Sequence, residues 1–173
     1  MDDAEELHRL IIRAYAPDLS LNILFHAGVI SMEEMVDHIK YVPTFVGENE
    51  HHIVVTVSIR LPWTPNSAPF RLPHLGWVAT VPEEKRKGYA KAIIDWIVME
   101  VLKKDYHAPA VTLGTAGEHP WLQDMYQKIG FQVLGQKRLF PDHVTVYMLR
   151  IVDNRLFERW KSKNISEFQS LLK

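Results

Sequence analysis

Apolar residues recur at helical spacing near the start of the chain. This spacing predicts an amphipathic helix over residues 2–15, and Pro17 is expected to end it. Ser31 and Glu34 then form a capping-box pattern, in which each residue bonds the backbone N–H of the other. A second helix is therefore predicted over residues 32–41.

The segment between these helices, residues 21–30, fits a strand, a short helix or an irregular stretch equally well. Farther along, β-branched runs and proline-rich breaks predict strands. The expected elements are strands over 44–47 and 52–61, a loop over 63–73, a strand over 75–81, a helix over 88–104, a strand over 109–114, a helix over 120–129, strands over 131–139 and 143–152 joined at Pro141-Asp142, and a helical tail over 156–173. The helix over 88–104 should bury a wide apolar face that includes Trp96 and Met99.

This order of elements predicts an α+β sandwich, in which a mixed, mostly antiparallel sheet carries helices on its faces. The strand, turn, helix and strand around Gly88 should form a right-handed crossover. We expect one domain over residues 1–152, followed by a polar helical extension over residues 153–173.

Composition narrows the class of protein. The chain has 173 residues, of which 47% are hydrophobic and 24% charged, and its net charge is −1, so no strong overall field attracts nucleic acid or membranes. It contains no cysteine, which excludes disulfides, thiolate metal sites and a cysteine nucleophile. No apolar run is long enough to cross a membrane, and the acidic start is unlike a signal peptide. These features favour a cytoplasmic protein.

The most informative stretch is GWVATVPEEKRKGYAKAIID, residues 76–95. A β-branched strand ends at Pro82, a basic turn follows, and Gly88, Tyr89 and Ala90 begin a helix. Exposed N–H groups and the positive end of the helix dipole converge at such a turn, which makes it an anion site. We interpret it as a pyrophosphate cradle, in which Lys85, Arg86 and Lys87 add positive charge. The alternative is a surface turn with solvated charges.

Two segments resemble the GNAT superfamily of acetyl-CoA-dependent N-acetyltransferases. Residues 78–90 resemble the family's acetyl-CoA motif, whose turn reads Lys85-Arg86-Lys87-Gly88-Tyr89-Ala90 here. The segment YQKIGF, residues 126–131, resembles the second signature, a helical tyrosine followed by Gly-Phe. The resemblance implies the GNAT fold, with acetyl-CoA as co-substrate and an amine as acceptor.

The chain departs from the family pattern at three points. Lys85 replaces the usual Arg or Gln, and His119 stands where many members have an asparagine. The family's first strand, which precedes the first helix, is also missing from its usual place. Either that strand is absent, or residues 21–30 supply a substitute, or the sequence begins after it.

The resemblance also implies roles for particular residues. Backbone groups of Val78, Ala79 and Thr80 would pair with the pantetheine amides of acetyl-CoA, helped by a bulge or splay of this strand. His119 joins the cradle residues 85–90 as a cofactor-binding candidate. The alternative for residues 78–80 is an ordinary central strand.

Acid and base catalysis need a proton donor and a proton acceptor. Tyr126 is the candidate acid for the CoA thiolate, although a lone tyrosine at helical spacing is more often part of a core. His74 is the first choice of base, because some GNAT histone acetyltransferases carry a glutamate at the matching position and histidine has a suitable unperturbed pKa. A loop histidine without a role is the equal alternative. Glu118 and His119 are the runners-up.

We therefore expect an N-acetyltransferase that transfers an acetyl group to a primary amine of a small molecule or peptide by direct attack. The alternative is a non-catalytic acyl-CoA-binding or interaction module on the same fold. No HExxH or similar pattern indicates a metal site, and nucleic-acid or membrane partners are not expected. A homodimer is the assembly we consider.

Overall fold

The computed structural model describes residues 3–20, 23, 25–64, 67–138 and 143–171. The chain divides into two compact units, and each is described by itself. Unit 1 comprises Met1–Ile59 and Gly76–Ile94, whereas unit 2 comprises Arg60–Leu75 and Asp95–Lys173. Strand β3 (His74–Thr80) runs from unit 2 into unit 1.

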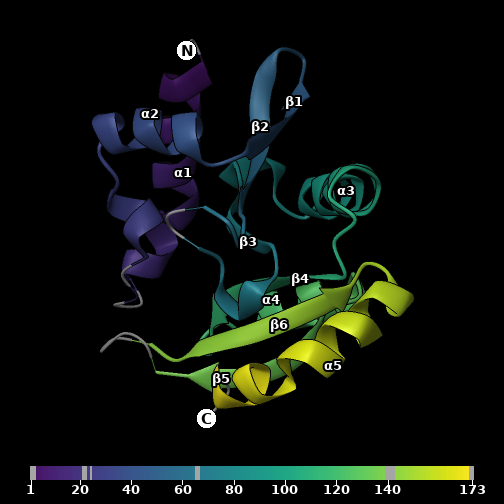
Figure 1. Cartoon of the computed structure of the whole chain (residues 1–173). Coiled ribbons are helices and arrows are strands. Elements are labelled where there is room, and N and C mark those ends of the chain that lie inside the picture. The colour runs from purple at the N-terminus through teal and green to yellow at the C-terminus, as the bar shows by residue number, and fades with distance from the viewer. Residues whose placement is uncertain (1–2, 21–22, 24, 65–66, 139–142, 172–173) are drawn as a thin grey trace. The chain divides into compact units, whose positions relative to one another are not determined.

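Two helices of unit 1, α1 (Asp3–Ser20) and α2 (Met32–Tyr41), lie against each other (Figure 1). In the ambiguous segment before α2, residues 26–29 form the short 3₁₀ helix η1 (His26–Val29). It is therefore a short helix there, and the described residues supply no substitute strand.

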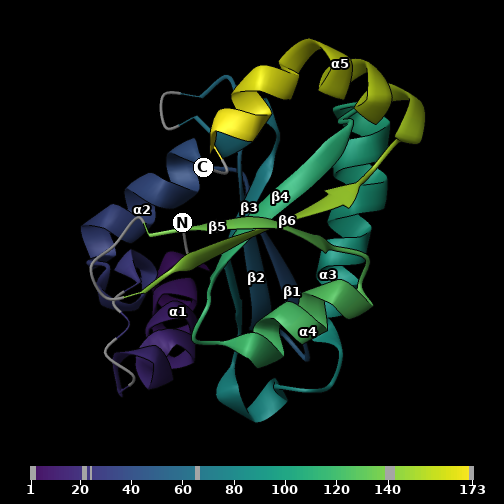
Figure 2. The same ribbon diagram turned by 90° about the horizontal axis from the view of Figure 1, so that it is seen from below.

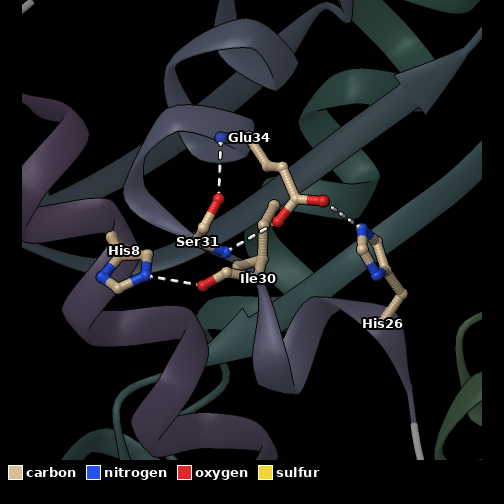
Figure 3. A network of polar contacts seen from close by, with 5 residues as sticks. All are labelled: His8, His26, Ile30, Ser31 and Glu34. Atoms are coloured by element: carbon tan, nitrogen blue, oxygen red, sulfur yellow. Dashed lines mark hydrogen bonds and ion pairs between the residues drawn. The ribbon is translucent and has the colours of Figure 1, made fainter.

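A polar network fixes the start of α2 (Figure 3). The predicted capping box is present: the Ser31 N–H donates to Glu34 Oε2 over 2.9 Å, and the Glu34 N–H donates to Ser31 Oγ over 3.2 Å. His8 Nε2 of α1 lies 2.8 Å from the carbonyl oxygen of Ile30, and His26 faces the Glu34 carboxylate at 3.6 Å. These contacts join α1, η1 and α2.

The prediction that Pro17 ends the first helix is wrong, because α1 continues to Ser20 with Pro17 inside it. Proline lacks an N–H and so removes one bond to the residue four positions earlier. Pro17 lies in the last turn, so the loss weakens the end of the helix without stopping it.

Strands β1 (Thr44–Asn49) and β2 (His52–Arg60) are antiparallel. Within unit 1, apolar side chains of α1, η1, α2, β2 and β3 form one core. Its buried members are Leu7, Leu10, Ile11, Ala27, Ile30, Met35, Ile53 and Ala79, and Trp77 packs against it with Val81.

The six strands are hydrogen-bonded in the order β1-β2-β3-β4-β6-β5. In unit 2, β4 (Ala110–Ala116) is antiparallel to β6 (Thr145–Ile151), which is antiparallel to β5 (Gln132–Lys137), and these three lie side by side in Figure 2. The start of β3 pairs in parallel with β4 through His74–Thr112 and Leu75–Leu113. A mixed, mostly antiparallel sheet flanked by helices confirms the expected α+β class.

The helix predicted over 88–104 forms as two parts, α3 (Tyr89–Trp96) and a π-helical continuation (Ile97–Asp105). The expected burial of Trp96 and Met99 is wrong, since they are 51% and 44% exposed. The buried residues come in pairs four positions apart, namely Ile93, Ile94, Ile97, Val98, Val101 and Leu102. Wider turns shift the buried face away from the 3.6-residue period on which the prediction relied.

Helices α4 (Pro120–Lys128) and α5 (Asn154–Leu171) complete unit 2, together with the 3₁₀ helix η2 (Pro69–Arg71). Side chains of Phe70, Leu72, Ala110 and Leu149 form a core against which Phe157 and Trp160 of α5 pack. Among the described helices, none is both long enough and apolar enough to cross a membrane. The turn predicted at Pro141-Asp142 lies outside the described residues.

Candidate functional site

The basic turn before α3 has the backbone of an anion site. Arg86 and Gly88 have φ values of 68° and 90°, while Lys87 between them is not in the left-handed region. Such alternation turns successive N–H groups toward one side, as in anion-binding nests. The Ala92 N–H donates to the carbonyl of Gly88 over 3.0 Å, so the N–H groups of Tyr89 and Ala90 precede the first bond of the helix.

Side chains leave this turn open and positively charged. A Cβ added to Gly88 would meet no atom within 4 Å, and Lys85, Arg86 and Lys87 are all exposed. Lys87 Nζ donates to Glu84 Oε1 over 2.8 Å, and this hydrogen bond raises the pKa of Lys87. The turn therefore has both the donors and the space that a pyrophosphate needs, with one lysine held by a neighbouring carboxylate.

The strand before this turn contains an irregular residue. Trp77 has φ 50°, a left-handed value that is rare for a bulky side chain, and we infer from it a local bulge in β3. The pairing of β3 with β4 comprises two residue pairs and ends at Leu75, two residues before Trp77. Val78, Ala79 and Thr80 follow the bulge, so the irregularity expected for a cofactor strand is present beside them.

His74, expected just before the strand, is the first residue of β3 and is buried. Thr112 Oγ1 donates to the carbonyl of Pro73 over 3.2 Å and lies 2.9 Å from His74 Nδ1. Because the single hydroxyl proton of Thr112 goes to Pro73, His74 Nδ1 carries the ring proton and Nε2 carries the lone pair.

The pKa of His74 differs from the unperturbed histidine value that suggested it as a base. Burial, together with the nearby Arg60 cation, lowers the pKa of His74 to about 3. Both effects disfavour the imidazolium, so the ring is neutral at neutral pH.

The runners-up for the base lie before α4. Glu118 is exposed, and its carboxylate accepts a hydrogen bond of 3.4 Å from the N–H of Val144. His119 is the N-cap residue of α4, is buried, and lies with its ring centroid 4.7 Å from that of Trp121. Glu118 therefore has a structural partner, and His119 packs as an aromatic side chain at a helix start.

Tyr126 lies in α4 and is 6% exposed. Its ring contacts Phe131 edge to face, with 5.8 Å between centroids, and its carbonyl accepts the N–H of Phe131 over 3.0 Å. Burial raises the pKa of the phenol, so the hydroxyl stays protonated at neutral pH. A buried, protonated phenol has the state that a proton donor requires.

The candidates thus fall into two sets. Residues 78–80 and 85–90 lie in unit 1, whereas His74, Glu118, His119 and Tyr126 lie in unit 2. Among the residues that the structure describes, no three His, Cys, Asp or Glu side chains are grouped so that they could hold a metal ion.

The sequence analysis missed two residues beside His74. Arg60 ends β2 and is half-buried, and Tyr147 of β6 has its ring centroid 6.3 Å from that of His74. The positive charge of Arg60 lowers the pKa of His74 and opposes the rise that burial causes in the pKa of Tyr147. For Arg60, the signal in the sequence was an arginine at the end of the β-branched run HIVVTVSIR.

Comparisons with known proteins identify the family of the chain. The model of the acetyltransferase (GNAT) family matches residues 11–131. S-(2-succino)cysteine N-acetyltransferase of Bacillus subtilis (strain 168) is 35% identical over 84% of this chain and 88% of its own length. S-alkylcysteine N-acetyltransferase of the same organism is 34% identical over 77% of this chain and 75% of its own length.

A solved structure shows the same fold at much lower identity. The ribosomal-protein-S18-alanine N-acetyltransferase of Escherichia coli superposes with a TM-score of 0.67 at 13% identity, covering 88% of this chain and 90% of that one. Both curated relatives are named as enzymes, so the alternative of a non-catalytic module is not favoured. The chain belongs to the acetyltransferase (GNAT) family and is an N-acetyltransferase that transfers an acetyl group to an amine.

Proposed function

We propose that this enzyme uses acetyl-CoA to acetylate the α-amine of S-substituted cysteines. The observation that carries the proposal is that two relatives, each more than 30% identical over most of both chains, are named for N-acetylation of such amino acids. S-(2-succino)cysteine and S-alkylcysteines share an α-amine next to an α-carboxylate and differ in the sulfur substituent. The shared part defines the acceptor class.

Acetyl-CoA would supply an activated acetyl thioester, and the residues of unit 1 fit its extended shape. The turn at Gly88, with its left-handed φ and open surroundings, suits a pyrophosphate, for which Lys85, Arg86 and Lys87 provide charge. N–H and C=O groups of residues 78–80, after the bulge at Trp77, suit the pantetheine amides. The N–H near Val78 would polarise the acetyl carbonyl.

The same proposal assigns proton transfers to two residues of unit 2. His74 Nε2 would accept a proton from the substrate ammonium or its product. Because the pKa of His74 is lowered to about 3, the ring would pass that proton on rather than keep it. Tyr126, whose pKa is raised by burial, would protonate the CoA thiolate. Glu118 and His119 remain the second choices for the base, and His119 also remains a cofactor-binding candidate.

The proposal extends to the setting of the enzyme. We assign residues 1–152 to one catalytic domain and residues 153–173 to an extension, most of which is helix α5. A cytoplasmic location, where acetyl-CoA is available, and a homodimer complete the proposal. Light scattering coupled to size-exclusion chromatography measures the assembly state.

Release of CoA in the presence of S-methyl-L-cysteine, S-(2-succino)cysteine, spermidine or an alanine-terminated peptide tests the acceptor class. The chain has no cysteine and the S-substituted acceptors carry no free thiol, so a thiol reagent reports only the released CoA. We expect kcat/KM to be highest for the S-substituted cysteines. Faster turnover of spermidine or of the peptide would contradict the proposed acceptor.

A further inference from the structure

Arg60 is the cation whose charge acts on His74 and Tyr147 in unit 2. It is half-buried at the end of β2, and burial lowers the pKa of its guanidinium. Within the described part of the chain, no carboxylate forms an ion pair with Arg60, whereas Arg150 of the same unit bonds Asp95 over 2.6 Å. A partly desolvated cation without a carboxylate is costly unless an anion binds to it.

The side chains around Arg60 come from three other elements of unit 2. His74 of β3 and Tyr147 of β6 both feel its charge, and their ring centroids lie 6.3 Å apart. Phe70 of η2 meets Tyr147 edge to face at 5.0 Å. One cation, one phenol and one neutral imidazole therefore lie near one another, and the ring of Phe70 packs against the phenol.

Gly114 of β4 is an exposed residue next to this cluster. Gly114 is exposed although the residues on both sides of it in β4 are buried. A Cβ at this position would lie 3.2 Å from Thr145 Cγ2, 3.8 Å from Tyr147 Cε1 and 3.9 Å from His74 Cε1, so a side chain there would crowd Thr145 and stand beside both rings. Glycine at this position therefore avoids a clash with Thr145 and puts no side chain against the two rings.

The tautomer of His74 determines which ring nitrogen can accept a proton. Thr112 holds Nδ1, so the lone pair on Nε2 is the ring's remaining hydrogen-bonding group. An amino-acid acceptor has its ammonium next to its carboxylate. A carboxylate bound at Arg60 would therefore bring the amine close to His74. It would also offset the Arg60 charge, which adds to burial in making protonation of His74 unfavourable.

We propose that Arg60, assisted by the Tyr147 hydroxyl, binds the α-carboxylate of the acceptor and thereby places its α-amine at His74. This inference rests on the proposed function, because it takes an S-substituted cysteine as the acceptor. The guanidinium fork matches a carboxylate with two parallel bonds, which lysine cannot reproduce. The enzyme then selects amino acids over simple amines.

Two matched amines test this assignment. S-methyl-L-cysteine has the α-carboxylate, and S-methylcysteamine is the same amine without it. Wild type should favour the former, and Arg60→Gln should raise its KM roughly tenfold to a hundredfold while leaving the KM for S-methylcysteamine and for acetyl-CoA nearly unchanged. Arg60→Lys should recover part of the loss, and Tyr147→Phe should show a smaller effect of the same kind. Arg155→Gln, at an exposed arginine of α5, controls for loss of one positive charge.

A measurement on wild type avoids any folding defect of the variants. The product N-acetyl-S-methylcysteine keeps the carboxylate but has lost the ammonium, so calorimetric titration against its methyl ester isolates the carboxylate contact. We expect the free acid to bind more tightly, and binding that is equal for acid and ester overturns the inference.

Different results would contradict the proposed function and the proposed role of Arg60. If wild type acetylates neither cysteine-derived amine, the proposed function fails and this inference fails with it. If both amines are acetylated with equal kcat/KM, or if Arg60→Gln impairs both equally, the acceptor class stands but Arg60 is not its carboxylate receptor. An effect on S-(2-succino)cysteine alone would assign Arg60 to the succinyl carboxylates and overturn the α-carboxylate assignment.

Discussion

The imidazole of His38 lies flat against the indole of Trp77, with ring centroids 3.5 Å apart and an interplanar angle of 6°. His38 belongs to α2, and Trp77 is the left-handed residue of β3. A left-handed conformation costs a bulky residue about 1–2 kcal/mol, which the surrounding contacts must offset. The stack therefore helps to hold Trp77 in this conformation, directly before residues 78–80, which we propose to bind acetyl-CoA.

His38 is itself held by a chain of hydrogen bonds. The Thr44 hydroxyl donates to the carbonyl of Val42 over 3.0 Å and lies 3.1 Å from Ser58 Oγ. Ser58 Oγ in turn lies 2.8 Å from His38 Nε2. Because the Thr44 proton is used by Val42, Ser58 donates to Thr44 and accepts from His38 Nε2–H.

Replacing His38 by alanine should release the bulge. We expect His38→Ala to lower the free energy of unfolding by about 1–3 kcal/mol, because it removes the stack and one partner of a buried hydroxyl. We also expect kcat/KM to fall, since Val78 follows Trp77 directly. Urea denaturation and steady-state kinetics measure the two effects. His26→Ala, at an exposed histidine of the same unit, is the control, and an equal loss in that variant would contradict the role of the stack.

Two histidines should make stability depend on pH. Burial is the main cause that lowers the pKa of His38 to about 4 and that of His74 to about 3, from the ordinary 6.5. The unfolded chain therefore binds protons at a pH where the folded chain does not. The free energy of unfolding should be fully present above about pH 6.5 and should fall as the pH decreases toward 4 and then 3.

Urea denaturation at a series of pH values between about 7.5 and 5 measures this dependence. His38→Phe keeps an aromatic ring at the stack but removes one titrating group, so its stability should change less over this range. A variant as sensitive to pH as wild type would show that His38 titrates normally in the folded chain.

The left-handed glycine of the cradle offers a direct test of cofactor binding. Gly88→Ala adds a Cβ that meets no atom, so its cost comes from φ 90° alone and should be about 1–2 kcal/mol. If the turn shifts to relieve this strain, KM for acetyl-CoA should rise several-fold. Gly130→Ala is matched in strain, because Gly130 also has φ 90°, but it lies after α4. A similar rise in both variants would argue against a role specific to the cradle.

Glu84 competes with a bound phosphate for Lys87. The two side chains are 2.8 Å apart, so phosphate binding must share or break that pair. Glu84→Gln should lower KM for acetyl-CoA, on the order of twofold to fivefold at low salt, and the gain should shrink as salt screens the charges. Lys87→Gln should raise the same KM. An unchanged KM in both variants would exclude Lys87 from phosphate binding.

Tyr126→Phe removes the proposed proton donor while it keeps the ring contact with Phe131. General acid catalysis contributes roughly a hundredfold or more, so kcat should fall by that order with little change in KM for acetyl-CoA. Single-turnover kinetics separate the transfer step from product release. Acetyl transfer that survives within a few-fold would rule out Tyr126 as the acid.

Local sequence determined most elements and the conformation of the turn before α3. The start of α2 follows from Ser31 and Glu34, which are three residues apart, and the left-handed turn follows from Gly88. Such features depend on backbone geometry and on contacts within one or two turns, so neighbouring residues specify them. The two signature segments could indicate the family for the same reason, because each is a short run of neighbouring residues.

Tertiary structure alone decided the chemistry around His74 and Trp77. The pKa of His74 depends on burial, on Thr112 of β4 and on Arg60 of β2, and the stack on Trp77 depends on His38 of a helix far back in the chain. In the sequence, Arg60 is only a residue near the end of a predicted strand. In the structure, β3 and β6 place His74 and Tyr147 where its charge changes their pKa values. Desolvation and charge coupling act through space between distant segments, and the order of residues along the chain does not contain those distances.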